Sequence, residues 1–168
     1  YTEALVISED IGDPSGVAKC RMGIGHCLRA KGDTDGALRE YREAEAQASK
    51  ANDEVLLGRI YTEIGTTYLN AGDFTLAEEI LRKAVNTLDR TGAQHEKSPT
   101  LLMLGTLAYS KGRYSDALGY YEKCMEIAEL TNNLRVHAQA LYYSAQAYSR
   151  MAEWQKSKAM LEMAEEAF

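Results

Sequence analysis

The sequence has 168 residues, of which 45% are hydrophobic and 26% charged, a balance typical of a globular chain. Its 19 basic and 25 acidic residues give a formal net charge of -6. This charge argues against a general nucleic-acid binder, which needs a basic surface, and no apolar run approaches the roughly 18 residues of a membrane-spanning helix. Three cysteines, Cys20, Cys27 and Cys124, are too few for a disulfide framework, so we expect a reducing, cytoplasmic setting.

A repeat with a period of 40 residues runs through the whole chain. Small residues recur in one register at two sets of positions, namely Gly25, Gly65, Gly105 and Ala145, and then Gly32, Gly72, Gly112 and Ala152. Two further sets of positions lie four residues apart, a helical spacing. The first set holds small residues, namely Ala37, Ala77, Ala117 and Ser157, and the second holds large ones, namely Tyr41, Leu81, Tyr121 and Leu161. Several columns that agree in one register indicate a repeat architecture.

In chain order, the register predicts the second helix of a truncated repeat over residues 1–13, followed by repeats at 14–53, 54–93, 94–133 and 134–168. The spacings of three, four and seven between apolar residues are typical of helices, so each repeat is expected to hold a first helix (helix A) and a second helix (helix B). In the first full repeat these helices run near 16–31 and 34–50.

The turns between these helices also repeat. Helix A should end at Gly32, Gly72 and Gly112, and helix B at Gly12, Asn52, Gly92 and Asn132, because these residue types tolerate the left-handed conformation of a C-cap. Asp33 and Asp73 suit the start of helix B, where a carboxylate accepts free backbone N–H groups.

This pattern resembles the tetratricopeptide repeat family. The residues that carry the resemblance are the Leu/Ile-Gly pair, the aromatic or Leu at Leu28, Tyr68 and Tyr148, and the Ala…Tyr/Leu…Ala run of helix B. The common family repeat has 34 residues, whereas the longer form here is similar to Pins-type adaptors, kinesin light chains and the sensor repeats of bacterial signal-transduction ATPases. The resemblance implies an all-α, right-handed α-solenoid of helix-turn-helix repeats that needs no cofactor.

In this family, helix A of each repeat lines a concave groove that binds a protein or peptide segment. Carried over column by column, most of the residues that line the groove are polar, aromatic or basic. They are Lys19, Met22, His26, Arg29, Arg59, Thr62, Thr66, Leu69, Asn70, Leu102, Thr106, Tyr109, Gln139, Tyr142, Gln146, Ser149 and Arg150.

Acidic and basic residues are distributed unequally between helix A and helix B. The segments assigned to helix A (17–31, 54–70, 98–111 and 134–150) hold eight bases and only two acids, Glu54 and Glu63. A mildly basic groove would attract a negatively charged peptide or helical segment. The alternative is that helix B is simply more exposed and therefore more charged.

Two other functions remain open at this stage. The chain could be a ligand-sensing repeat domain of a larger signalling or transcription regulator, or a structural spacer that self-associates through Met160, Met163 and Phe168 near its C-terminal end. No catalytic or metal constellation is recognisable, because Cys20, His26 and Cys27 lack a second pair of ligands. We therefore expect a binding module rather than an enzyme.

Overall fold

The computed structural model describes residues 1–166, together with the side chains of residues 1–165. Within this range every regular element is an α-helix, so the predicted all-α fold is confirmed. The helices fall into two compact units, Tyr1–Thr91 (unit 1) and the residues from Gly92 onward (unit 2). None of these helices combines the length and apolarity needed to cross a membrane.

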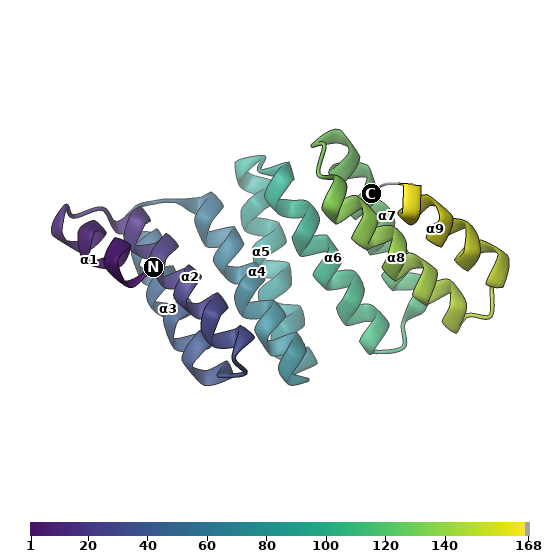
Figure 1. The fold of residues 1–168 in the computed structure, drawn as a ribbon, viewed down its shortest axis with the longest axis horizontal. Helices are drawn as coiled ribbons and strands as arrows, with labels where there is room; N and C mark the ends of the chain where they lie inside the picture. The colour runs from purple at the N-terminus through teal and green to yellow at the C-terminus, as the bar shows by residue number, and fades with distance from the viewer. Residues whose placement is uncertain (167–168) are drawn as a thin grey trace. The chain divides into compact units, whose positions relative to one another are not determined.

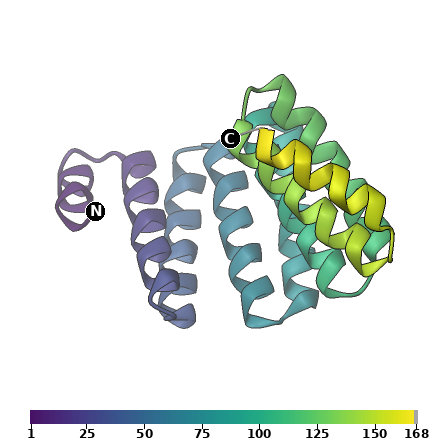
Figure 2. The same ribbon diagram turned by 45° about the vertical axis from the view of Figure 1, so that its right-hand side comes forward.

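Unit 1 contains two complete helix pairs preceded by one helix. Its elements are α1 (Thr2–Asp10), α2 (Pro14–Ala30), α3 (Thr34–Lys50), α4 (Glu54–Ala71) and α5 (Phe74–Thr91). Helix α2 pairs with α3 and α4 pairs with α5, and α3 packs on α4, so that the pairs stack (Figures 1 and 2). Each pair is a helix A followed by its helix B, as predicted.

Unit 2 repeats this arrangement with two further pairs. Its elements are α6 (Gln94–Ser110), α7 (Tyr114–Leu130), α8 (Leu134–Arg150) and α9 (Trp154–Glu166). Helix α6 pairs with α7 and α8 with α9, while α7 packs on α8 (Figure 1). Helix A thus corresponds to α2, α4, α6 and α8. Whether both units act as one continuous solenoid stays a prediction.

The turns follow the sequence columns. Gly32, Gly72 and Gly112 all have positive φ, and so do Asn52 and Asn132 at the ends of helix B. The carboxylates of Asp33 and Asp73 accept hydrogen bonds from the backbone N–H groups of Gly36 and Leu76, at 2.8 and 3.1 Å. These contacts satisfy donors that the first turn of a helix leaves unpaired.

The core explains why small residues alternate with large ones. The Tyr41 and Tyr121 rings of helix B lie so close to Gly25 and Gly105 of helix A that a Cβ atom at either glycine would overlap them. Leu81 occupies the same position against Gly65, and all three large side chains are buried. Glycine therefore lets each helix A approach its own helix B closely, while the large side chain fills the space between them.

Candidate protein-interaction surfaces

The outer face of helix A in unit 1 is polar. Lys19, Arg59 and Asn70 are exposed on α2 and α4, and His26 and Thr66 are half-buried in equivalent positions of the two helices. Because α2 and α4 are neighbours in unit 1, these side chains belong to one surface. We call it the helix-A surface of unit 1.

The helix-A surface of unit 2 carries more aromatic and amide groups. Tyr142 is 50% exposed and Arg150 is also exposed, both on α8. The remaining predicted lining residues of α6 and α8 that reach the surface are half-buried, namely Thr106, Tyr109, Gln139, Gln146 and Ser149.

Four residues predicted to line the groove are instead buried: Met22, Thr62, Leu69 and Leu102. Met22 belongs to a hydrophobic cluster that includes Ile60 and Tyr61 of α4. Helix A therefore packs against the next helix A as well as against its own helix B, and less of its circumference remains free than a single helix pair would leave. These four side chains have too little surface to contact a ligand directly.

An acidic residue interrupts the predicted basic character of unit 1. Glu63 Oε2 on α4 lies 3.0 Å from Arg29 Nη2 and 3.1 Å from His26 Nε2, both on α2. Burial by itself would raise the pKa of Glu63, but the neighbouring His26, Arg29 and Arg59 outweigh it and lower that pKa. Glu63 therefore carries a negative charge that offsets the bases around it.

This polar cluster is built into the core of unit 1. The ring centroids of His26 and Tyr41 are 5.8 Å apart in an edge-on arrangement, and Tyr41 is fully buried. Burial raises the pKa of Tyr41 more than the nearby Arg29 lowers it, so the phenol stays protonated. Arg29 and His26 consequently link α2 to α4, and they are less available to a ligand than the sequence suggested.

The bases of the helix-A segments differ in their surroundings. Arg21 pairs with Glu9 and Glu40 at 3.4 and 3.2 Å. Lys19 and Arg59, by contrast, are exposed on the helix-A surface of unit 1 and form no ion pair within the described side chains. These two residues supply most of the accessible positive charge on that surface.

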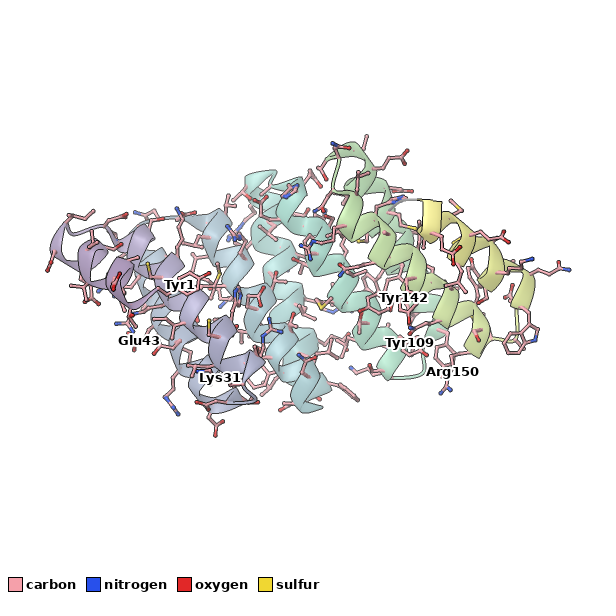
Figure 3. The ribbon with its side chains drawn as sticks, viewed as in Figure 1. Tyr1, Lys31, Glu43, Tyr109, Tyr142 and Arg150 are labelled. Carbon is pink, nitrogen blue, oxygen red and sulfur yellow. The ribbon has the colours of Figure 1, made fainter. Side chains whose placement is uncertain are left out.

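Aromatic side chains meet in unit 2. The ring centroids of Tyr109 on α6 and Tyr114 on α7 are 5.3 Å apart, and Arg150 Nε on α8 donates a hydrogen bond to the Tyr114 hydroxyl at 3.2 Å. The ring centroids of Tyr142 and Tyr143 are 5.7 Å apart, and the two rings are tilted by 57°. Figure 3 shows Tyr142, Tyr109 and Arg150 following one another along this surface. Tyrosine and arginine are the residue types that most often anchor protein interfaces.

Side chains 1–165 contain no group of three His, Cys, Asp or Glu placed to hold a metal ion. Cys20 and Cys124 are buried, while Cys27 is exposed. Burial raises the pKa of the Cys124 thiol to about 12, so this group is a protonated packing residue.

Two residues that organise these surfaces were not predicted from the sequence. Glu63 occupies the same column as Gly23, three positions before the column of His26 and Thr66, so the register itself could have placed it beside His26. Tyr114 begins helix B, whereas only residues of helix A were predicted to line the binding surface.

Part of the chain matches a known protein family. Residues 56–130 match the sequence model of the tetratricopeptide repeat family. No match to this chain is found among curated protein sequences. The family match covers helices of both units.

Solved structures share the fold over nearly the whole chain. BtubC (BKLC) from P. vanneervenii is 19% identical with a TM-score of 0.77, and the match covers 92% of this chain and 64% of that one. Aspartyl phosphate phosphatase F from Bacillus subtilis is 17% identical with a TM-score of 0.85, over 92% of this chain and 41% of that one. This chain therefore spans less than two thirds of either protein.

A putative kinesin light chain from Podospora anserina with nearly identical TPR-like repeats has a TM-score of 0.70 at 15% identity, over 97% of this chain and 81% of that one. Such distant likenesses establish the fold alone. Together with the family match, they confirm the solenoid fold class that the sequence predicted. Residues 56–130 match the tetratricopeptide repeat family, and the chain as a whole has the fold of tetratricopeptide-like repeat proteins.

Proposed function

We propose that this protein binds a peptide or helical segment of a partner protein through its helix-A surfaces, and that it does so without catalysing a reaction. One observation carries the proposal. In three repeats the same column of helix A is half-buried and holds a hydroxyl or amide that can form hydrogen bonds, namely Thr66, Thr106 and Gln146, while His26 in the first repeat is engaged by Glu63. Pre-formed polar positions of this kind orient a ligand at low entropic cost.

The preference for an acidic segment rests on different residues than the sequence suggested. Arg29 is occupied by Glu63, so the accessible charge in unit 1 comes from Lys19 and Arg59. In unit 2 it comes from Arg150. We propose that an acidic segment is still preferred, with a smaller electrostatic contribution and a larger one from Tyr109 and Tyr142.

Binding of short peptides of varied charge to the purified protein tests this proposal. The variant Lys19→Glu/Arg59→Glu reverses the accessible charge on the helix-A surface of unit 1 and keeps both partners of the Arg29–Glu63 hydrogen bond. Arg39→Glu/Lys50→Glu is a matched control, because both residues are exposed on α3 and the change in net charge is identical.

The first variant should bind acidic peptides about tenfold more weakly than the unaltered protein, while the control should change affinity less than about twofold. Equal losses in both variants would mean that only the net charge matters, and this result would contradict a helix-A binding surface. Binding that neither variant changes would do the same.

Self-association is a second candidate, which the apolar surface of α9 favours. Met163 is 48% exposed and Leu161 is exposed beside it, while Met160 is half-buried. Phe168, the third residue predicted for this contact, lies outside the described residues. Light scattering over a dilution series should then show a dimer that Met163→Lys dissociates. A monomer at all concentrations would exclude this role.

A further inference from the structure

A second surface of unit 2 lies at the turns that join each helix A to its helix B. Residues 109–116 and 149–156 form these turns, and they hold four bases and two acids, namely Lys111, Arg113, Arg150 and Lys156 with Asp116 and Glu153. The equivalent residues of unit 1, 29–36 and 69–76, hold two bases and three acids. In a chain with a net charge of -6, this edge of unit 2 is thus locally positive.

Large side chains accompany the positive charge. Trp154 is 65% exposed at the start of α9, and Met151 is exposed at the end of α8. Met151 shares a shallow hollow with Arg113 and Tyr114, so the two turns contribute to one surface. The Arg150 guanidinium lies 5.9 Å from the centre of the Tyr114 ring. We call the surface of Arg113, Tyr114, Arg150, Met151 and Trp154 the turn edge.

In these two turns of unit 2, two positions hold residues that stabilise the fold less than the equivalent residues of the other repeats. Arg113 stands at the N-cap of α7 and forms no side-chain capping bond, whereas the equivalent Asp33 and Asp73 both do. An arginine also places positive charge at the positive end of the helix dipole. Ala152 has φ of 60°, a left-handed conformation, where the other repeats have glycine. Locally unfavourable residues that gather on one surface point to a function there.

We propose that the turn edge of unit 2 is a docking surface for an acidic peptide segment of a partner protein, one that carries a large apolar side chain between its carboxylates. The carboxylates face Arg113 and Arg150, and the apolar side chain lies against Met151 and Trp154. Charge complementarity selects this partner, because the two turns hold two more bases than acids, although Asp116 pairs with Arg113 and Glu153 pairs with Lys156. The inference goes beyond the helix-A surfaces, and it shares with them Arg150 and the premise that the protein binds other proteins.

The single tryptophan of the chain reports on this surface directly. The probes are short synthetic peptides of Asp and Glu around a Leu or Phe, together with charge-reversed versions in which Lys and Arg replace the acids. The acidic peptides should shift the Trp154 emission to shorter wavelength and bind about tenfold more tightly than their reversed versions. Added salt should weaken the binding.

Three variants separate docking from folding. Arg113→Asn removes a cation and supplies a capping side chain, so it should weaken peptide binding about fivefold while raising the melting temperature. Arg150→Gln should weaken binding by a similar factor. Ala152→Gly relieves the left-handed conformation without changing charge, and it should raise the melting temperature with affinity unchanged. Weaker binding in a more stable protein cannot be ascribed to unfolding.

Several results would overturn the proposal. They are an unshifted Trp154 emission, equal affinity for acidic and charge-reversed peptides, and unchanged affinity in both arginine variants. If binding is lost in Lys19→Glu/Arg59→Glu but kept in Arg113→Asn and Arg150→Gln, the helix-A surfaces bind the peptide and the turn edge does not. The reverse pattern supports the turn edge and leaves the proposed function of the helix-A surface of unit 1 without support.

Discussion

The Glu63 carboxylate on α4 accepts a hydrogen bond from the Arg29 guanidinium on α2 at 3.0 Å. This contact joins the first helices of two adjacent repeats, whereas most of the packing in unit 1 lies within a repeat or between helix B and the next helix A. It also sets the charge of the helix-A surface of unit 1, since it neutralises one of the bases that would otherwise face a ligand.

Replacing Glu63 by Gln should destabilise unit 1, since Arg29 and His26 would lose their anion. Hydrogen bonds to charged groups contribute about 1.5–3 kcal/mol, so we expect a loss on the order of 2 kcal/mol at neutral pH by urea unfolding. Glu54→Gln removes an exposed ion pair with Arg90 at 3.1 Å and is the control. This variant should change the free energy of unfolding by less than about 1 kcal/mol. Equal effects would show that the Glu63 contact has no special role.

The stability that the Glu63–Arg29 pair contributes should depend on pH. The pKa of Glu63 is lowered in the folded protein from its ordinary value of 4.5. A lowered pKa contributes stability that is present above 4.5 and is lost as the pH falls below it, through the folded-state value. The difference in unfolding free energy between the unaltered protein and Glu63→Gln should therefore shrink on acidification. A difference that stays constant would contradict the ionised pair.

Two glycine substitutions test the close packing of helix A on helix B. Gly105→Ala would place a Cβ atom against the buried ring of Tyr121. Overpacking destabilises a core by about 1–3 kcal/mol, and the better helix propensity of alanine offsets about 1 kcal/mol of this loss. Gly119→Ala on α7 meets no atom within 4 Å. It should gain up to about 1 kcal/mol from helix propensity. Thermal unfolding of both variants measures the contrast, and a stabilised Gly105→Ala would disprove the tight contact.

The turn-edge substitutions also make a stability prediction. Arg113→Asn introduces the kind of cap that Asn133 already forms with the Val136 backbone N–H, and it should raise the free energy of unfolding by about 1 kcal/mol. Ala152→Gly should gain a similar amount, roughly 1 kcal/mol, because alanine at φ of 60° has an unfavourable left-handed conformation. Denaturant midpoints measured together would show whether both gains are present. A loss in either variant would mean that its side chain stabilises the turn.

Thiol reactivity should separate the three cysteines. Cys27 is exposed, whereas Cys20 and Cys124 are buried, and burial raises the pKa of Cys124 to about 12. Because the thiolate is the reactive form, a thiol reagent at mildly alkaline pH should modify Cys27 quickly and the other two only after unfolding. Mass spectrometry of the native protein over time checks this. Rapid modification of Cys124 would contradict its burial in the core.

The fold was largely predictable from the sequence because its determinants are local and repeated. The left-handed caps at Asn52 and Asn132 and the helical spacing of the apolar residues follow from residue type and spacing alone. Each of these sequence features recurs every 40 residues. An ambiguous residue in one repeat can therefore be interpreted from the equivalent residues of the other repeats.

The candidate surfaces were less predictable because they depend on contacts between repeats. Column position placed Met22 and Leu102 on the groove, but packing of one helix A against its neighbours buries both. The count of bases on helix A overlooked the position of Glu63 beside Arg29. The number of bases in a segment gives its total charge. The charge that a ligand meets at the surface also depends on which of these bases pair with acidic side chains.

The most direct test of the account is to map a bound acidic peptide on the isotopically labelled protein by NMR. We predict that the amide signals that shift belong to exposed and half-buried residues of α2, α4, α6 and α8, including Arg59, Gln146 and Arg150. Shifts confined to the outer faces of α3, α5 and α7 would contradict the proposal that helix A provides the binding surface.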